Sequence, residues 1–367
     1  MNRLRFTLIT LLAVFLASAA GAAVIHPSDR YITRPAMSMA PIRAIVASSL
    51  IKVEYTRDSH QRVEIYAPDN IIDFVKLTYR AGTLSVAFET EHEIRTEWNG
   101  KPNSGQFDIT VRIWAADVSA FRAKSLANIA IHSPLDVKGS CDFECESSAS
   151  IRSKSGVKAT GNVTADCSST GQIVLGDIDC RDIEIKSQGV GSISVGSMDA
   201  DMVTLNAQST GSIMTGDILG RKSVQATVFS TGKIRIGKVV THSLQATMAS
   251  IGKLKIESAN CESIVARCTS GGSVEMEGIA ATTVTARSSG TGSIELEGDC
   301  TEAEYSASEA ATINAEDLRA AKVVATSTSN VAKISCTALD SFSGFAFNQA
   351  VFDVSGNPRE YSFTPRG

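Results

Sequence analysis

The sequence has few aromatic residues, few prolines and no recognisable catalytic motif. Aromatic residues make up 6% of its 367 residues, and proline occurs only 8 times. So little bulky side-chain material argues against a thick globular core and favours thin, regular layers. The nucleophile-elbow pattern G-x-S-x-G, the zinc-protease pattern H-E-x-x-H and the EF-hand loop are absent. The five histidines are scattered, which indicates surface or turn positions.

Long apolar runs are also lacking after the first 22 residues. Arg3 and Arg5 precede an apolar run over residues 8–16 and then Ala20-Gly21-Ala22, the pattern of a cleaved signal peptide. The run is too short to span a bilayer and no second one follows, so we expect no transmembrane segment in the mature chain. We therefore expect export to the periplasm, the cell surface or the medium.

Basic residues are fewer than acidic residues. Removing residues 1–22 takes away two arginines and leaves 33 basic against 39 acidic residues, a net charge of −6. This balance argues against nucleic acid or an anionic membrane as the main partner. The eight cysteines form no C-x-x-C pair and lie near no histidine cluster, so we predict neither a zinc site nor another metal or cofactor.

What the sequence has in abundance is a period of about twenty residues between Ala149 and Thr312. Seven glycines open similar phrases, and successive glycines are separated by 20, 20, 21, 20, 20 and 20 residues. They are Gly171, Gly191, Gly211, Gly232, Gly252, Gly272 and Gly292. We interpret this glycine as a corner residue with positive φ, which glycine adopts without steric cost. A phosphate-binding role fits less well, because no helix follows.

Each unit contains two short stretches in which apolar and polar residues alternate. Ile173/Leu175 and Ile183/Ile185 are one example, and the alternation is typical of half-buried strands. Two strands and two turns in a fixed short period predict an all-β, single-stranded β-solenoid (β-helix) with rungs about 4.8 Å apart. Weaker matches on both sides of the glycines extend the register to about eleven or twelve rungs.

The register also accounts for the cysteines. Five of them fall on inward positions that suit a small core residue: Cys141, Cys145, Cys167, Cys268 and Cys336. Cys145 and Cys167 are predicted to be vertical neighbours about 4.8 Å apart, within disulfide range, and the sequence leaves open whether they are bonded. Cys180, Cys261 and Cys300 are predicted to lie in turns, too many rungs apart to pair readily.

We divide the chain into five parts. Residues 1–22 are the signal peptide, 23–41 an irregular leader, 42–126 a β-rich N-terminal cap that merges into the solenoid, 127–352 the solenoid repeats and 353–367 a C-terminal tail. A cap is expected because the first rung would otherwise expose a strand edge. The alternative is a separate domain, but no convincing linker divides the cap from the repeats.

The N-terminal part carries a family resemblance. The phrase AGTLSVAFE, then FDITVRIWAADVSAFRAKSLANIAI, then repeated G-x-I units resembles the head GIN domain family of putative auto-transporter adhesins. The similarity covers about residues 42–350. It implies an exported β-solenoid protein of the Gram-negative cell envelope with an adhesin-like role. The family offers no catalytic residues to carry over.

Outward residues of successive rungs form vertical columns. The candidate binding patch is the basic cluster Lys233, Arg235, Lys253 and Lys255, which suits acidic sugars but equally suits edge protection or solubility. A second candidate is a polar ladder of Gln225, Gln245, Thr227 and Thr247, which can meet sugar hydroxyls or simply cover a solvated sheet.

Stacked glutamates in neighbouring columns have two interpretations. Glu275 and Glu295, like Glu257, Glu277 and Glu297, would lie about 5 Å apart and could bind a cation or act as a glycosidase pair. We favour a solvated charged face, because Lys255 beside Glu275 offsets the repulsion.

The sequence thus favours a non-catalytic, adhesin-like solenoid that binds a surface ligand along a broad outer face or acts as an envelope scaffold. A glycan or another envelope protein is the candidate partner. The alternative is a polysaccharide lyase or hydrolase, since β-helices host those activities. Such an enzyme would need long inserted loops, and the near-constant rung length from Gly171 to Gly292 leaves none there.

Overall fold

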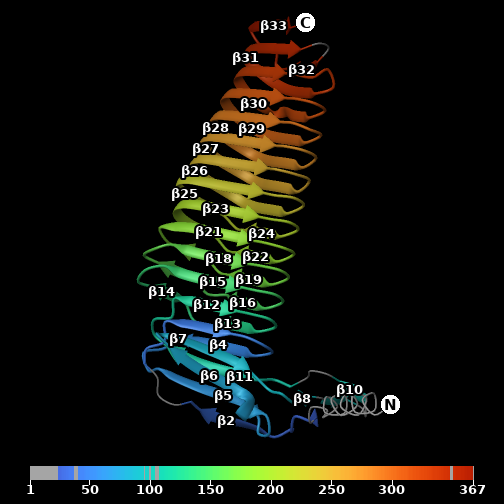
Figure 1. Cartoon of the computed structure of the whole chain (residues 1–367). Helices are drawn as coiled ribbons and strands as arrows, with labels where there is room; N and C mark the ends of the chain where they lie inside the picture. Colours follow the sequence, from blue (N-terminus) through green and yellow to red (C-terminus); the bar gives the residue numbers. More distant parts are fainter. Residues whose placement is uncertain are drawn as a thin grey trace, which may run out of the picture.

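The computed structural model describes residues 24–36, 40–94, 96–98, 101–103, 107–347 and 350–366. Most of these residues form one tall column of stacked strands, and two small two-stranded sheets lie outside its ladder (Figure 1). The described residues are 67% strand and 1% helix, with about 12 turns whose rungs lie about 20 residues apart, so the predicted β-solenoid is confirmed. No described helix has the length and apolar character needed to cross a membrane. The predicted signal peptide, residues 1–22, lies outside the described residues.

The lower end of the column combines antiparallel pairs with the first parallel rungs. Strand β5 (Arg62–Pro68) pairs antiparallel with both β2 (Tyr31–Pro35) and β11 (Thr110–Ala115). Strands β6 (Val75–Arg80) and β7 (Thr83–Phe88) form another antiparallel pair. Strands β3 and β4 pair in parallel with the repeats above them. The elements of this end are β1 (Val24–Ile25), β2 (Tyr31–Pro35), β3 (Ala44–Ala47), β4 (Lys52–Arg57), β5 (Arg62–Pro68), the 3-10 turn η1 (Ile72–Phe74), β6 (Val75–Arg80), β7 (Thr83–Phe88), β8 (Glu93–Ile94), β9 (Thr96–Trp98), β10 (Lys101–Asn103) and β11 (Thr110–Ala115).

Each lower rung of the repeats contains three strand segments, one more than the sequence analysis predicted. The first segments are β13 (Asn128–Ile131), β16 (Ser150–Ser153), β19 (Gln172–Leu175), β22 (Ser192–Val195) and β24 (Ser212–Thr215). The middle segments are β14 (Leu135–Val137), β17 (Val157–Ala159) and β20 (Ile178–Asp179). The last segments are β12 (Ala120–Ala123), β15 (Cys141–Cys145), β18 (Val163–Cys167) and β21 (Asp182–Ser187). A middle segment holds so few residues that its alternation does not stand out in the sequence.

Higher in the column the segments join into longer strands. Strands β23 (Met198–Ala207) and β25 (Ile218–Val228) contain the middle and last segments of their rungs. Above them a single strand runs through all three segments: β26 (Lys233–Met248), β27 (Lys253–Cys268), β28 (Ser273–Ser288), β29 (Ser293–Ala307), β30 (Thr312–Ser327) and β31 (Lys333–Phe347). Each residue pairs with its equivalent about twenty positions later, as Lys233 pairs with Lys253 and Met248 with Cys268.

The ladder continues into the region predicted as a tail. Strands β32 (Val351–Ser355) and β33 (Glu360–Arg366) both pair in parallel with β31. Residues in 353–366 therefore extend the ladder beyond β31. Tyr361 and Phe363 alternate with Ser362 and Thr364, but a single short period-two stretch without the repeat phrase is weak evidence in a sequence.

The core is a set of vertical stacks of small and branched apolar side chains. In one rung Ile173, Leu175, Ile178, Ile183 and Ile185 all point inward and are buried. The rungs above and below bury the same positions, since Ile173 pairs with Ile193 and Ile183 with Val203. Because each apolar layer is sealed by its neighbours, a rung depends on stacking for its stability.

The repeated glycine is required by packing, which corrects the sequence interpretation. None of the seven glycines adopts a positive φ; in six of the seven units that conformation belongs to the residue two positions earlier, such as Ser169 at 60° and Ser230 at 62°, and Gly252 is the exception. A Cβ at Gly292 would lie 2.7 Å from Cys268 Sγ, and one at Gly191 would lie 2.9 Å from Cys167 Sγ. The glycines thus give room to side chains of neighbouring segments. The sequence could not show these contacts, because they join different rungs.

All eight cysteines are free thiols. Cys145 and Cys167 are register partners, as predicted, and Cys145 Sγ donates a hydrogen bond to the Ala149 carbonyl at 2.9 Å. Cys261 and Cys300 do not lie in turns: they occupy β27 and β29 in one column of small residues, separated by Ala281.

Cys180 follows β20 directly and is buried as well, so it belongs to the inner wall. The turn assignment was wrong for Cys261 and Cys300 because the short middle segment had not been recognised, whereas Cys180 does lie at the bend between β20 and β21. Burial raises the pKa of the Cys180 and Cys261 thiols to about 11 and that of Cys300 to about 12, so they stay protonated at neutral pH.

Candidate functional site

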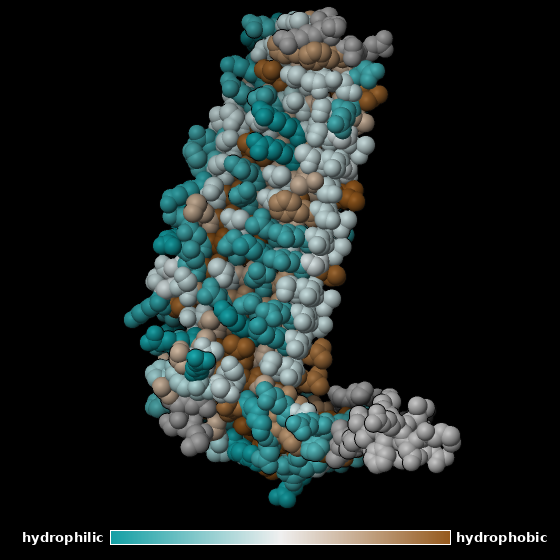
Figure 2. All heavy atoms as spheres, viewed as in Figure 1, coloured by the Kyte–Doolittle hydropathy of each residue, from teal (hydrophilic) through white to brown (hydrophobic). Residues whose placement is uncertain are grey.

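The face of the column seen in Figure 2 carries mostly hydrophilic and near-neutral side chains, with hydrophobic residues in smaller patches. Many of the charged residues pair across rungs. Arg122 contacts Glu144 at 2.9 Å, Lys124 contacts Glu146 at 3.0 Å and Lys322 contacts Glu302 at 3.3 Å. Because the ladder fixes the vertical spacing, opposite charges one rung apart are placed within reach of each other.

The predicted basic patch is part of this pattern. The structure brings its four residues together, since Lys233 is in register with Lys253 and Arg235 with Lys255. Three of them, however, contact glutamates of the rung above: Arg235 with Glu257, Lys253 with Glu275 and Lys255 with Glu277, each at 2.5 Å. These pairs lower the positive potential that the patch offers to an anionic sugar. Its role in binding stays a prediction.

The glutamate columns end in a small hollow of about 80 Å³ lined by Glu275, Glu277, Glu295, Glu297, Asn314 and Asp317, with Met276 and Leu296. Two of these glutamates already contact lysines of the patch. Over the described ranges, no group of His, Cys, Asp or Glu has the arrangement of a metal site. The predicted polar ladder is also in register, with Gln225 beside Gln245 and Thr227 beside Thr247.

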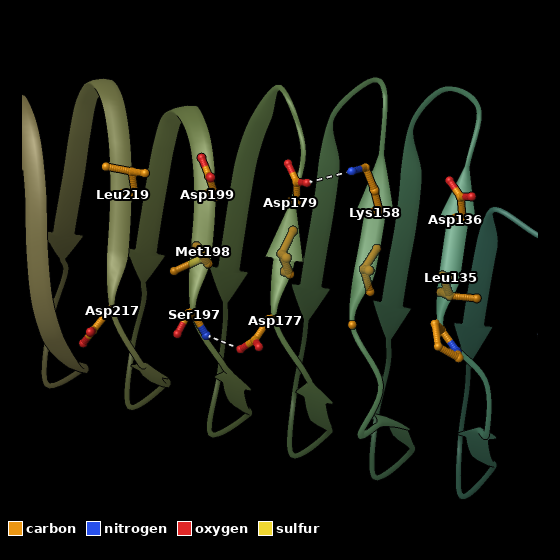
Figure 3. A pocket seen from close by; sticks show the side chains of 14 residues that line it. Leu135, Asp136, Lys158, Asp177, Asp179, Ser197, Met198, Asp199, Asp217 and Leu219 are labelled. Atoms are coloured by element: carbon orange, nitrogen blue, oxygen red, sulfur yellow. Dashed lines mark hydrogen bonds and ion pairs between the residues drawn. The ribbon is translucent and has the colours of Figure 1, made fainter.

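A hollow lies along the middle segments and is called the groove. It has a volume of about 600 Å³ and spans five successive rungs. Figure 3 shows two rows of side chains, one on each side of these segments. The first row is Pro134, Gly156, Asp177, Ser197 and Asp217; the second row is Asp136, Lys158, Asp179, Asp199 and Leu219. Leu135, Val157, Ile178 and Met198 lie between the rows.

Local strand geometry explains this shape. Successive residues of a strand point to opposite faces, so an inward residue such as Ile178 leaves its neighbours Asp177 and Asp179 on the outside. Repetition of this triplet in each rung produces two parallel rows with an aliphatic floor. Ile178 and Met198 are each only 2% exposed, so the floor is made of backbone and the edges of core side chains.

The groove is acidic. Its lining contains five aspartates and a single cation, Lys158, whose Nζ lies 3.3 Å from Asp179 Oδ2. Outside the groove, Arg221 contacts Asp199 at 2.5 Å and Arg57 contacts Asp136 at 3.8 Å. A carboxylate can accept several hydrogen bonds, so these contacts leave acceptor positions free for a ligand.

Two of the aspartates have a structural role as well. Asp177 Oδ1 accepts a hydrogen bond from the Ser197 backbone N–H at 2.7 Å (Figure 3), and Asp217 Oδ1 accepts one from the Lys238 N–H at 3.1 Å. They satisfy backbone donors at the bend before the middle segment, where the strand ladder is interrupted. The other three, Asp136, Asp179 and Asp199, are the carboxylates best suited to meet a ligand.

Sequence reasoning missed the groove. It expected only turns between the two strands of each unit and did not align the residues within them. A signal was present: at a period of twenty, Asp179 aligns with Asp199 and Asp177 with Ser197 and Asp217. The aliphatic floor has no comparable signal, because Ile178 and Met198 look like any other core residue.

Comparison with known proteins places the chain in a family but gives no curated relative, since no curated protein matches it. Among solved structures it is similar to a putative adhesin from Parabacteroides merdae ATCC 43184, with 14% identity over 91% of this chain and 99% of that chain and a TM-score of 0.38. It is also similar to a putative adhesin from Parabacteroides distasonis ATCC 8503, with 16% identity over 81% of this chain and 99% of that chain and a TM-score of 0.40.

A third similar structure is a putative lipid binding protein from Parabacteroides distasonis ATCC 8503. It shares 12% identity over 94% of this chain and 97% of that chain, with a TM-score of 0.27. The family model described as "Putative auto-transporter adhesin, head GIN domain" matches residues 42–259 and 238–358, well over half of the sequence. The resemblance seen in the sequence is thereby confirmed, and the chain belongs to this head GIN domain family.

Proposed function

We propose that this protein is an exported, non-catalytic adhesion protein that binds a surface ligand in the groove along its middle segments. Family membership supports an adhesin-like role. The observation that carries the choice of site is the groove itself, whose volume of about 600 Å³ falls in the usual range of ligand sites. It is also held on a rigid ladder of strands, so binding would not require the site to be ordered first.

The groove is a better candidate than the basic patch for an electrostatic reason. In the patch, three of the four cations already contact a carboxylate one rung away. In the groove, five aspartates face three cations, Lys158 in the lining and Arg57 and Arg221 beside it, so a net charge of −2 remains to attract a partner. The groove also adds a concave shape.

Export is supported by the pattern of residues 1–22. The burial of the cysteines is compatible with an oxidising compartment, because burial raises the pKa of the Cys141 and Cys336 thiols to about 12 and so suppresses the reactive thiolate. Expression of the full chain in a Gram-negative host tests this part. Mass spectrometry of the protein in the envelope fraction should show a chain that begins at Ala23, and an uncleaved cytoplasmic product would contradict it.

Catalysis is not part of the proposal. A lyase or hydrolase would need a free general base and a free cation around the substrate, whereas Lys158 is paired with Asp179. An assay of the full chain for product release from acidic polysaccharides, with and without calcium, checks this point. Reproducible product release would overturn the non-catalytic assignment.

The binding test compares two sites on one protein. Fluorescently labelled chain is applied to a glycan array and to intact bacterial cells, and a Ser197→Trp variant serves to fill the groove. Ser197 is exposed, and its hydrogen bonds to Asp177 and Ile178 are made by its backbone N–H and carbonyl, so the substitution should leave the fold intact. Charge reversal of Lys233, Arg235, Lys253 and Lys255 is the matched control. Binding lost in the groove variant and kept in the control supports the proposal, and the reverse result contradicts it.

A further inference from the structure

We propose that the groove binds a linear aliphatic polyamine, a methylene chain that carries two or more ammonium groups. This inference rests on the proposed function, because it takes the groove as the binding site and names the class of ligand. Three features of the groove favour such a ligand: the positions of its carboxylates, the chemistry of its floor and the contact made by Lys158.

The carboxylates form two rows that run along the axis of the column. In one row Asp179 and Asp199 are register partners on adjacent rungs, about 4.8 Å apart along the axis. In the other row Asp177 and Asp217 are two rungs apart, or about 9.6 Å. A ligand that neutralises several of them at once must carry several cationic groups at short intervals along a narrow chain. Ammonium groups separated by three or four methylenes have comparable intervals.

The lining between the rows is aliphatic. It consists of Leu135, Val157, Ile178 and Met198, and Leu219 extends the apolar surface at one end of the second row. No aromatic side chain lines the groove, so the stacking platform that favours a sugar ring is missing there. Methylenes between charged groups would lie against this surface and leave water, while the ammonium groups would reach the rims.

Lys158 shows how such a ligand would be held. Its alkyl chain belongs to the wall of the groove, and its Nζ lies 3.3 Å from Asp179 Oδ2 on the next rung (Figure 3). An alkyl ammonium group of the ligand would make the same kind of contact with Asp199 or Asp136. The exposed ends of these carboxylates point into solvent, so no buried charge has to be created before the ligand arrives.

A compact dication is a poorer match than a chain. The described residues contain no group of acids close enough together to enclose a metal ion. The two acidic rows instead stand on opposite sides of the middle segments (Figure 3), which favours a ligand that extends along the groove and contacts both rims.

Isothermal titration calorimetry of the full chain with spermidine tests the inference. We expect saturable binding that weakens with added salt, no binding of the uncharged chain 1,8-octanediol, and weak competition by Mg²⁺ at equal charge concentration. In the double variant D179N/D199N the affinity should fall about tenfold, since each exposed carboxylate–ammonium contact is worth up to about fivefold. Glu302→Gln is the matched control, because Glu302 is an exposed acid that contacts Lys322 at 3.3 Å outside the groove.

Several results would overturn the inference. Affinity retained in D179N/D199N would show that spermidine binds elsewhere. Competition by Mg²⁺ as strong as that by spermidine at equal charge concentration would show that the binding is only charge screening. Tighter binding of tetralysine, with loss of that binding in D179N/D199N, would assign the groove to a basic polypeptide in place of a free polyamine.

The adhesion assay separates this inference from the proposed function. If Ser197→Trp abolishes binding to cells and spermidine does not bind, the ligand class is wrong and the site stands. If Ser197→Trp leaves binding to cells unchanged, the proposed site is wrong whatever spermidine does.

Discussion

The repeated glycine offers the sharpest test of how the rungs are packed. Gly252 is buried, and a Cβ built on it would overlap the carbonyl oxygen of Gly232 and lie 2.8 Å from Val228 Cγ1. The same carbonyl accepts the hydrogen bond of the Lys253 N–H at 3.1 Å. The Gly232 backbone therefore cannot move away from an added methyl group without loss of a ladder hydrogen bond.

We expect Gly252→Ala to lower the free energy of unfolding by about 3 kcal/mol, the upper part of the range for overpacked cores. The midpoint of thermal unfolding, followed by far-UV circular dichroism, should fall by roughly 5–10 °C. Ile251→Ala is the control, because the Ile251 side chain, next to Gly252, is 64% exposed at the tip of the turn. Its free energy of unfolding should change by no more than about 0.5 kcal/mol.

A third variant distinguishes packing from backbone conformation. If the glycine served a positive φ, Asn would be the best-tolerated replacement, because Asn enters the left-handed region more readily than Ala. Under the packing account Asn is larger and therefore worse. A Gly252→Asn protein that is more stable than Gly252→Ala, or a Gly252→Ala protein as stable as the control, would refute the reasoning.

Three further predictions concern stability. Tyr305→Phe should raise the free energy of unfolding by about 1 kcal/mol, because Tyr305 Oη is buried and has no hydrogen-bond partner among the described protein groups. Tyr55→Phe should lower the free energy of unfolding by about 1–2 kcal/mol, because Tyr55 Oη donates to the Ala115 carbonyl at 2.8 Å. Urea titrations that give the opposite order would contradict this prediction. The hydrogen bond from Lys52 lowers the pKa of Glu54 below its ordinary value of 4.5, so the contribution of this pair to folding stability is present above pH 4.5 and is lost as the pH falls through the lowered pKa. Lys52→Met should therefore flatten the pH dependence of the free energy of unfolding below about pH 5. An unchanged profile would show that Glu54 is not the cause. Deletion of residues 233–252, one full period, should leave a folded, slightly shorter column because Lys253 takes the place of its register partner Lys233, whereas deletion of 233–242 should not; size-exclusion chromatography and circular dichroism check both.

The fold was predictable because every rung must present the same alternation of apolar and polar residues in order to stack on its neighbours. The period from Gly171 to Gly292 and the alternation at Ile173/Leu175 depend only on residues that are near each other in sequence. Those signals were sufficient for the solenoid, for the register of Cys145 with Cys167 and for the family. They did not reveal the middle segments, since a stretch such as Ile178–Asp179 is too short to display an alternation.

The parts that failed depend on contacts between rungs. The reason for Gly252 lies in a carbonyl twenty residues earlier, and the ion pairs that offset the basic patch join Arg235 to Glu257 across the ladder. The candidate groove is formed by two rows of residues, so it is recognised only when the relative position of both rows is known. Asp177 and Asp179 acquire different surroundings because the chain bends between the segments. A sequence can place these residues in columns but cannot show which columns enclose a hollow.

The central claim is that the groove, not the basic patch, is the binding site. Two methionines report on these sites separately: Met198 lines the groove, and Met214 is 55% exposed and is in register with Arg235 of the patch. NMR of the protein labelled with ¹³C in its methionine methyl groups, titrated with spermidine and then with an acidic oligosaccharide, observes both at once. We predict that spermidine shifts the Met198 signal and leaves Met214 unchanged. A Met214 signal that responds to the oligosaccharide, with Met198 unmoved by either titrant, would contradict the account.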